Sequence, residues 1–317
     1  MVRCYGDSKT GLGHLIRSLA LSRALAAKGA ECVFLVEENI ARTLIELDAK
    51  AEVISRWPEK ADFILYDMPW IEGEWLDAAR ARYPDARMVG LDFFDYARQS
   101  MDLVINLYDH GPKEQKKQNA RTRFLTGPQY AIIRDEFKPF RKNTIDVRDT
   151  IEKALVTFGS ADPQRFSLAI LDAFDALPQA AISVVCGIRF DHAGMLRDEL
   201  LKRGNRFRFL QAPVDMPSLM AEADLVVCGG GTTMLEAAFL GAPAVVLGQT
   251  ERECAFAKDM CQRGTCVFSL QPGNLSKMLE ATICNGYRRK MAIAGRETVK
   301  DEGIDRIVAE IIRQAPA

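Results

Sequence analysis

Two glycines followed at once by a histidine, in Gly11-Leu12-Gly13-His14, are the residues of this chain with the most evident chemical use. They stand between a short apolar run and a long helical pattern, so a turn that enters a helix is expected. Glycine lets an anion approach the backbone, and the free N–H groups at a helix start bind anions. The positive end of that helix disfavours imidazolium, so a neutral His14 can serve as a general base on water.

Two neighbours of this turn are candidates to assist His14. Asp7, at the end of the preceding apolar run, is the candidate that orients the imidazole. Arg17, one helical turn beyond, is either a salt-bridge residue or a phosphate contact. A lone histidine more often caps or packs a helix than takes part in chemistry, so the catalytic interpretation depends on the glycine context.

Two further glycine turns follow apolar runs and precede helical patterns, one at Gly159-Ser160 and one at Gly229-Gly230-Gly231-Thr232-Thr233. Three strand–turn–helix units of this kind favour a phosphate-bearing ligand. The dinucleotide fingerprint is disfavoured, because Ile16 stands where its third glycine is required. The P-loop order fails as well, because Lys9-Thr10 precede the glycines instead of following them.

The elements that must position these turns alternate along nearly the whole chain. Short apolar runs predict strands at Val2–Tyr5, Cys32–Val36, Ala51–Ser55, Phe63–Tyr66, Met88–Leu91, Leu103–Ile105, Ala154–Phe158, Ile182–Val185, Phe207–Leu210, Leu225–Cys228 and Ala244–Leu247. Helical patterns predict helices at His14–Lys28, Ile40–Leu47, Glu72–Arg82, Pro163–Ala176, Ala193–Lys202, Pro217–Met220, Met234–Leu240, Glu251–Arg263, Asn274–Ile283, Arg288–Thr298 and Ile304–Arg313. Asp162 is expected to cap the helix that Pro163 begins.

Strands without polar alternation are typical of a parallel sheet covered by helices on both faces, so we expect an α/β fold. In such sheets the carboxyl ends of the strands line the ligand crevice, and Asp7, Asp67, Asp92 and Asn106 fall at such ends. Turn formation or helix capping is the alternative role for each of them. The similar rhythm of the two halves predicts two Rossmann-like domains, 1–149 and 150–317, joined by a polar linker at 137–150. The last helix is a candidate to pack back on the first domain.

The segment from Asp224 to Pro243 resembles the nucleotide-diphosphate site of GT-B glycosyltransferases and their relatives. It holds a strand, the triple-glycine turn, then Glu236 and a Gly-x-Pro break at 241–243. The resemblance implies a GT-B-like fold whose two Rossmann-like domains face each other across a cleft. It also implies that the turn holds the diphosphate and that Glu236 binds the ribose hydroxyls. Thr233-x-x-Glu236 is, however, also a capping box, in which Glu236 bonds back to the Thr233 N–H without any ligand.

Motifs along nearly the whole chain are similar, in the same order, to those of pseudaminic-acid-pathway UDP-sugar hydrolases and related spore-coat polysaccharide proteins. They are Gly11-x-Gly13-His14-x-x-Arg17, Tyr66-Asp67, Leu91-Asp92, the segments 126–131 and 156–163, and the triple-glycine segment. This resemblance implies a metal-independent hydrolase that removes UDP from UDP-2,4-diacetamido-2,4,6-trideoxy-altrose, with His14 as the catalytic residue and no cofactor. The predicted substrate-binding residues are Gly11, Gly13, Arg17, Asp67, Gly159, Ser160, Gly230, Gly231, Thr232, Thr233, Glu236, Gln249 and Glu253.

Two departures from the family pattern fall where sugar contacts are expected. The run Gln249-Thr250-Glu251-Arg252-Glu253 stands where the family often has an Asn-Gln pair, and Met68-Pro69-Trp70 where it usually has a histidine or tyrosine. The sugar therefore stays open, and so does its acceptor. A glycosyltransferase that moves the sugar to a glycan is the alternative to a hydrolase, and a non-catalytic nucleotide-sugar-binding component is a third hypothesis.

Composition and charge exclude several other classes. The 317 residues are 48% hydrophobic and 27% charged, which is ordinary for a globular protein of about two domains. A net charge of −1, with no basic patch that alternates with aromatics, argues against a nucleic-acid partner. Neither a leader peptide nor an apolar run of about 18 residues is evident, so we expect a cytoplasmic protein without a membrane span, most simply a monomer.

Metal binding is also not expected. The three histidines are far apart, the eight cysteines form no Cys-x-x-Cys pair, and the chain has no Asp-x-Asp motif to bridge a metal and a diphosphate. The basic stretch 110–123 is expected to be a solvated loop. His110 and His192 are expected to be loop or surface residues.

Overall fold

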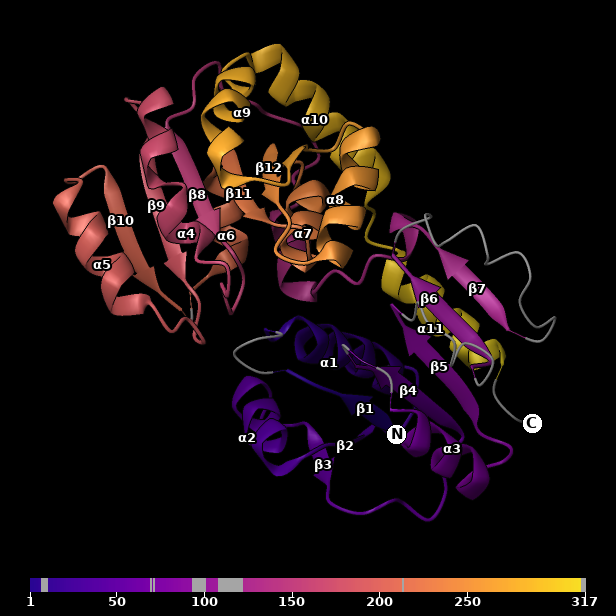
Figure 1. Ribbon diagram of the computed structural model, residues 1–317. Helices are drawn as coiled ribbons and strands as arrows, with labels where there is room; N and C mark the ends of the chain where they lie inside the picture. Colours follow the sequence, from indigo (N-terminus) through magenta and orange to yellow (C-terminus); the bar gives the residue numbers. More distant parts are fainter. Residues whose placement is uncertain are drawn as a thin grey trace. The chain divides into compact units, whose positions relative to one another are not determined.

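The computed structural model describes residues 1–6, 11–68, 70, 72–92, 101–107, 122–212 and 214–314. The chain divides into two compact units, of which unit 1 comprises Met1–Ile132 with Glu302–Ala317 and unit 2 comprises Ile133–Asp301 (Figure 1). The predicted residues Asp7, Pro69 and His110, and most of the basic stretch 110–123, lie outside the described residues. The domain boundary at 149/150 stays a prediction.

Unit 1 is built on a sheet of seven parallel strands in the order β3-β2-β1-β4-β5-β6-β7. The strands are β1 (Val2–Cys4), β2 (Val33–Leu35), β3 (Glu52–Ile54), β4 (Phe63–Asp67), β5 (Arg87–Leu91), β6 (Leu103–Asn106) and β7 (Arg123–Thr126). Its helices are α1 (Gly13–Ala26), α2 (Glu38–Leu47), α3 (Gly73–Arg82), the 3-10 turn η3 (Pro128–Tyr130) and α11 (Gly303–Arg313).

Unit 2 repeats this plan with six parallel strands in the order β10-β9-β8-β11-β12-β13. The strands are β8 (Lys153–Thr157), β9 (Ala181–Cys186), β10 (Phe207–Gln211), β11 (Leu225–Gly229), β12 (Ala244–Leu247) and β13 (Val267–Ser269). The helices are η4 (Asp135–Phe140), α4 (Phe166–Ala169), η5 (Leu171–Ala176), α5 (Ala193–Lys202), α6 (Met216–Glu222), α7 (Thr232–Leu240), α8 (Glu251–Gln262), η6 (Pro272–Asn274), α9 (Leu275–Thr282) and α10 (Asn285–Thr298).

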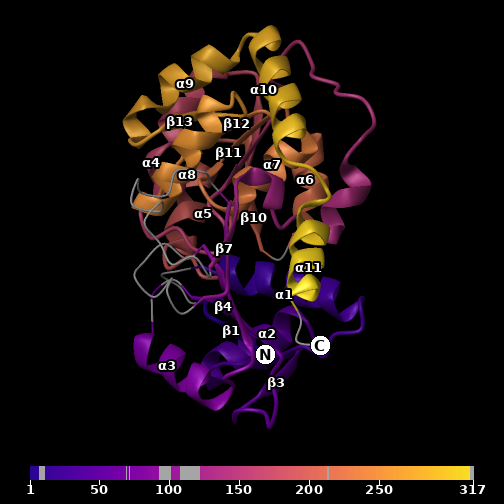
Figure 2. The same ribbon diagram turned by 90° about the vertical axis from the view of Figure 1, so that its right-hand side faces the viewer.

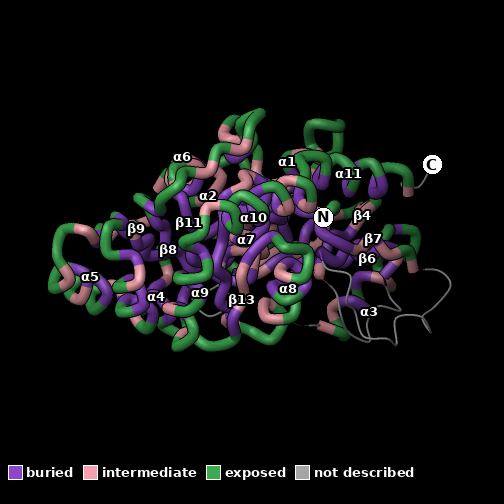
Figure 3. The backbone as a smooth tube through the Cα atoms, turned by 90° about the horizontal axis from the view of Figure 1, so that it is seen from above, coloured by how far each residue is buried: buried purple, intermediate pink, exposed green. Residues whose placement is uncertain are grey.

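The expected class, two parallel-sheet α/β domains, is confirmed. Central strands such as β11 are buried along their whole length, which explains why they read as continuous apolar runs (Figure 3). Strand order reverses between β1 and β4 in unit 1 and between β8 and β11 in unit 2. Ligands of doubly wound sheets bind outside the carboxyl ends of the strands at such a reversal. All three glycine turns follow these strands.

The last helix completes the core of unit 1. Figure 2 shows α11 beside α1, and the two helices pack together. The apolar residues of α11 join the cluster that holds Leu15 and Leu19 of α1; they are Ile304, Ile307, Val308 and Ile311. Gly303 begins α11 where a Cβ atom would lie 2.1 Å from the carbonyl oxygen of Ala131, so only glycine fits there.

One predicted helix differs in the structure, and two strands were not predicted. The helix expected at 163–176 begins only at Phe166, because Arg165 takes a left-handed conformation (φ 53°), and it divides into two short pieces, α4 and η5. Asp162 therefore caps α4 from further back, accepting from the N–H groups of Phe166 (2.9 Å) and Ser167 (2.8 Å). Strands β7 and β13 were missed because they are short edge strands with only one fully buried residue each.

The segment 137–150, expected as a linker, is held on unit 2 by polar contacts. Arg288 is fully buried, and its guanidinium donates to the carbonyl oxygens of Arg148 and Asp149, both at 2.9 Å. Asn285 donates to the carbonyl oxygens of Val147 and Arg148, again at 2.9 Å. The amino end of α10 thus fixes this irregular segment.

Candidate functional site

The turn between β1 and α1 requires glycine at two described positions. Gly11 has a left-handed φ of 72°. A Cβ atom on Gly6 would lie 2.8 Å from the carbonyl oxygen of Gly11 and 2.9 Å from Cγ of Leu15, so the strand end and the turn approach each other closely. Gly6 escaped the sequence analysis because it lies outside the Gly-x-Gly-His pattern. Helix α1 begins at Gly13, which places His14 in its first turn.

His14 contacts a carboxylate that arrives from a neighbouring strand. Its Nδ1 lies 2.6 Å from Oδ1 of Asp67, the last residue of β4, and β4 pairs with β1 in the sheet. Asp67 is completely buried. Arg17 donates to both of its oxygens, from Nε to Oδ2 at 2.8 Å and from Nη2 to Oδ1 at 2.5 Å. The Ser18 hydroxyl donates to Oδ2 at 3.0 Å.

This carboxylate is ionised and fixes the tautomer of the imidazole. Burial raises the pKa of Asp67, but the positive charge of Arg17 and the bonds from Arg17 and His14 outweigh it and hold the pKa well below its usual range. An ionised carboxylate only accepts hydrogen bonds, so the proton between His14 and Asp67 belongs on Nδ1. Arg17 Nη2 also lies 3.0 Å from Nδ1, and with this tautomer it donates to Oδ1 of Asp67 instead. The Nε2 lone pair of a neutral His14 is then available as a base.

Arg17 links this pair to a second strand end. It forms ion pairs with Asp67 and with Asp92, the residue after β5. Asp92 has a left-handed φ of 48° and also accepts from the Leu107 N–H at 3.4 Å, at the end of β6. This geometry corresponds to the salt-bridge alternative for Arg17. It also places Asp67 where it orients His14. Asp7, for which this role was predicted, lies outside the described residues.

In unit 2, two glycine turns lie at the carboxyl ends of adjacent strands. The turn Gly159-Ser160 follows β8, with Gly159 left-handed (φ 77°). A Cβ atom on Gly187 would lie 2.4 Å from the Gly159 carbonyl oxygen, so the loop after β9 packs tightly on this turn. The turn Gly229-Gly230-Gly231 follows β11 and leads into α7 at Thr232. Thr232 and Thr233 therefore lie in the first turn of α7.

Glu236 does not form the capping box that was the alternative to a ribose contact. Helix α7 begins after Gly231 without a side-chain cap. Glu236 instead accepts a hydrogen bond from Arg134 Nε at 2.8 Å, and the Arg134 guanidinium lies over the ring of Phe137, 4.8 Å from its centre. Burial raises the pKa of Glu236, although Arg134 opposes the shift. No local pattern pointed to Arg134, because its partner lies 102 positions away.

Gln249 and Glu253 lie beside the triple-glycine turn. Oε2 of Glu253 accepts from the N–H groups of Gln249 (2.8 Å) and Gly230 (3.2 Å). Gln249 Nε2 reaches the carbonyl oxygen of Phe158 at 3.5 Å, just before the Gly159 turn. The structure therefore brings the predicted residues of unit 2 together around the ends of β8, β11 and β12, apart from Glu236, which lies one turn further along α7.

His192 lies in the turn before α5, which agrees with the loop interpretation, but it is buried and not at the surface. Its Nε2 lies 3.0 Å from the Ser167 hydroxyl and 3.4 Å from Oδ2 of Asp162, and its Nδ1 lies 2.9 Å from Oδ1 of Asp191. The ring also stacks on Phe190. Ser167 is as buried as His192, so this group is a packed polar network that supports the start of α4 and not an exposed nucleophile.

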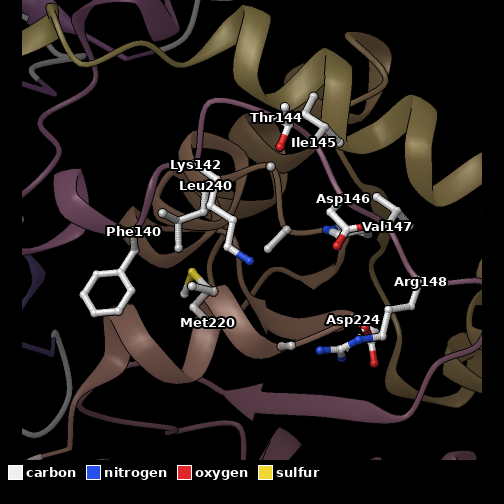
Figure 4. A pocket seen from close by; sticks show the side chains of 15 residues that line it. Phe140, Lys142, Thr144, Ile145, Asp146, Val147, Arg148, Met220, Asp224 and Leu240 are labelled. Atoms are coloured by element: carbon white, nitrogen blue, oxygen red, sulfur yellow. Dashed lines mark hydrogen bonds and ion pairs between the residues drawn. The ribbon is translucent and has the colours of Figure 1, made fainter.

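A separate pocket of unit 2 lies at the other end of the strands of its sheet. It is lined by the segment 140–148, by α6 and by the residues that precede β11 and β12, among them Asp224, which pairs with Arg148 (Figure 4). None of the predicted site residues lines it. It therefore lies at the amino ends of the strands, away from the glycine turns.

Neither a metal site nor a membrane-spanning helix is recognisable in the described residues. No group of three or more histidine, cysteine, aspartate or glutamate residues there has a metal-binding arrangement. None of the helices in the described ranges is both long and apolar enough to span a membrane.

Comparison with known proteins places the fold among the GT-B glycosyltransferases. Residues 154–285 match the profile of the Glycosyltransferase family 28 C-terminal domain. The chain is 25% identical over 327 residues to SpsG of Bacillus subtilis, a spore coat polysaccharide biosynthesis protein, covering 96% of this chain and 95% of that protein. MurG of Acinetobacter baumannii has a similar structure, with a TM-score of 0.69, 16% identity and 99% coverage of both chains. So has HepE of Anabaena in complex with UDP-glucose, with a TM-score of 0.61, 15% identity and 98% coverage of both.

Proposed function

We propose that the protein hydrolyses a UDP-linked amino or deoxy sugar at its anomeric carbon and releases UDP and the free sugar. The sugar would serve nonulosonic acid or surface polysaccharide biosynthesis in the cytoplasm. The observation that carries the proposal is the His14–Asp67 contact of 2.6 Å in a chain with the GT-B fold. The similarity to a spore coat polysaccharide biosynthesis protein supports the pathway class.

His14 acts as general base in the proposed reaction. Its Nε2 takes a proton from the water that attacks the anomeric carbon, while the bond from that carbon to the diphosphate oxygen breaks and UDP leaves. Asp67 holds the proton on Nδ1 and stabilises the imidazolium that forms, as the aspartate does in a Ser-His-Asp triad. Arg17 and Ser18 fix the carboxylate, so the imidazole needs little reorganisation at the moment of reaction.

Unit 2 binds the nucleotide in this proposal. The N–H groups of the triple-glycine turn and the start of α7 stabilise the negative charge of the leaving diphosphate. Glu236, oriented by Arg134, accepts from the ribose hydroxyls. The family 28 match over 154–285 and the UDP-glucose complex of HepE both support a nucleotide-sugar ligand.

The test is UDP release without any acceptor. The protein should release UDP from UDP-2,4-diacetamido-2,4,6-trideoxy-altrose, or from another member of a UDP-sugar panel. His14→Ala should slow UDP release by about 10²–10⁴-fold, which is the usual contribution of a general base to the rate. Added imidazole should restore part of the rate in this variant and leave the unsubstituted protein unchanged. Release that continues unchanged in His14→Ala would exclude the proposed mechanism.

The second candidate is a glycosyltransferase that moves the sugar to a glycan. The match to the Glycosyltransferase family 28 C-terminal domain over residues 154–285 favours it. It predicts that UDP appears only when an acceptor is added. Both candidates are proposed to act without a metal, because the sequence holds no Asp-x-Asp motif. Turnover should therefore survive EDTA.

A further inference from the structure

The carboxylate of Glu253 occupies backbone N–H groups at the turn where the diphosphate is proposed to bind. Its Oε2 accepts from Gly230 at 3.2 Å and from Gln249 at 2.8 Å. Gly230 lies in the loop after β11, and Gln249 lies in the loop after β12, the paired neighbour of β11. One carboxylate therefore joins two loops at the carboxyl edge of the sheet.

Backbone contacts fix the position of Glu253 beside the turn. Thr250 caps α8 by accepting from the Glu253 N–H at 3.2 Å, which fixes Glu253 in the first turn of the helix. A Cβ atom on Gly230 would lie 2.6 Å from the carbonyl oxygen of Glu253, so the turn and the helix touch through their backbones. The side chain is thus directed at the amides of the turn.

In the described chain, the groups that interact with the Glu253 carboxylate include no cation. In the described chain, both hydrogen bonds to the carboxylate come from backbone amides. Burial raises the pKa of Glu253, and the nearby carboxylate of Asp162 adds to the shift, while the two amides oppose it. Its other titratable neighbours are the thiols of Cys228 and Cys254, whose pKa values burial also raises. Within the described residues, these titratable neighbours of Glu253 are therefore neutral or acidic.

Gln249 adds a second, independent observation. Its side-chain oxygen Oε1 is buried and accepts no hydrogen bond from any described residue. A buried acceptor without a donor costs free energy, so the site favours an additional proton donor near the turn. A protonated Glu253 or a hydroxyl of a ligand is a donor of the required kind.

We propose that the carboxylate of Glu253 disfavours anionic ligands at this turn and so lowers the affinity for a diphosphate. Its carboxylate competes with phosphate oxygens for the amides of Gly230 and Gln249 and repels the diphosphate by like charge. Nucleotide binding therefore requires that Glu253 is protonated or displaced. Glu253 thereby lowers the affinity for UDP, the product of the proposed reaction, and so favours its release. This inference rests on the proposed function, because it assumes that the turn binds a nucleoside diphosphate.

The experiment compares UDP with uridine by calorimetry in three forms of the full chain. Glu253→Gln keeps an oxygen that can accept from both amides but removes the charge, and it should bind UDP about tenfold tighter or more. Its affinity for uridine, which lacks phosphate, should stay within about twofold. Glu251→Gln is the matched control, because it removes the same charge from the exposed face of the same helical turn, and it should leave both affinities within about twofold.

The outcomes separate the two proposals. If Glu253→Gln weakens UDP binding, or changes UDP and uridine equally, Glu253 is only a structural clamp and charge selection is refuted. Glu253→Ala, which also frees the amides, should tighten UDP binding in the same way and answers the question if the glutamine variant does not fold. If the unsubstituted protein binds no UDP, the proposed function fails instead.

Discussion

Arg134 Nε donates to Oε1 of Glu236 at 2.8 Å, although the two residues lie 102 positions apart in the chain. Glu236 is buried, and the guanidinium of Arg134 stacks on the ring of Phe137. The ion pair fixes the orientation of the Glu236 carboxylate and therefore the direction in which its second oxygen points. Arg134 is therefore a positioning residue for the ribose contact proposed for Glu236.

Ribose discrimination tests this relationship. We expect the unsubstituted protein to prefer UDP over 2′,3′-dideoxy-UDP by about 10- to 100-fold, because hydrogen bonds to a carboxylate are strong. Glu236→Gln and Arg134→Gln should both reduce this ratio toward one, and Arg134→Lys should restore part of it. A calorimetric ratio that stays the same in both glutamine variants would contradict the ribose role of Glu236.

Asp67→Asn tests the orientation of His14. Asparagine has nearly the same shape but cannot hold the Nδ1 proton as an ionised carboxylate does, so we expect kcat to fall by about 10²–10⁴-fold with a smaller change in KM. Ser18→Ala is the matched control: it removes one hydrogen bond to the same carboxylate but leaves its charge, and should cost less than about tenfold. Equal losses in the two variants would show that Asp67 is only structural.

Acid should weaken unit 1 through the same carboxylate. The folded-state pKa of Asp67 lies below its unfolded value, so its contribution to stability is complete above the unfolded pKa and is lost as the pH falls toward the folded one. At pH 7, Asp67→Asn should lower the free energy of unfolding by about 1.5–3 kcal/mol, because Arg17 loses one of its two carboxylate partners and keeps Asp92. This difference should shrink progressively below about pH 5.

Tryptophan fluorescence measures unit 1 separately, because all three tryptophans, Trp57, Trp70 and Trp75, belong to it. Urea unfolding at several pH values then compares the two proteins without interference from unit 2. A difference that stays constant down to pH 3 would mean that the ion pair between Asp67 and Arg17 adds nothing to stability.

Gly303→Ala should destabilise unit 1. The added Cβ would meet the carbonyl oxygen of Ala131, a backbone atom that cannot move aside as a side chain could. We expect a loss of about 1–3 kcal/mol, the usual cost of overpacking, read from the same fluorescence transition. Gly73→Ala is the control, since Gly73 also begins a helix of unit 1 but has open space around it. A stable Gly303→Ala protein would show that α11 can shift on its neighbours.

The sequence predicts the elements well where burial alone defines them. Strands such as β11 and β12 are apolar throughout because both faces are covered, and Gly241, left-handed at φ 76°, marks the end of α7. The edge strands β7 and β13 carry too few buried residues to form such a pattern.

The site is predictable only as far as local pattern reaches. His14 is found through its glycines and Asp67 through its place at a strand end, but their contact depends on the pairing of β1 with β4. The pairing of Arg134 with Glu236 and the burial of His192 depend on packing between distant segments, and no local pattern announces them.

The position of α11 in the chain has a consequence for synthesis on the ribosome. Unit 2 is continuous from Ile133 to Asp301, so all of it has been translated before α11 begins. Unit 1 obtains Ile304, Ile307, Val308 and Ile311 only after unit 2 has been translated. Of the two units, the one that begins first is therefore the last to complete its core, and until then α11 does not cover its apolar face around Leu15 and Leu19.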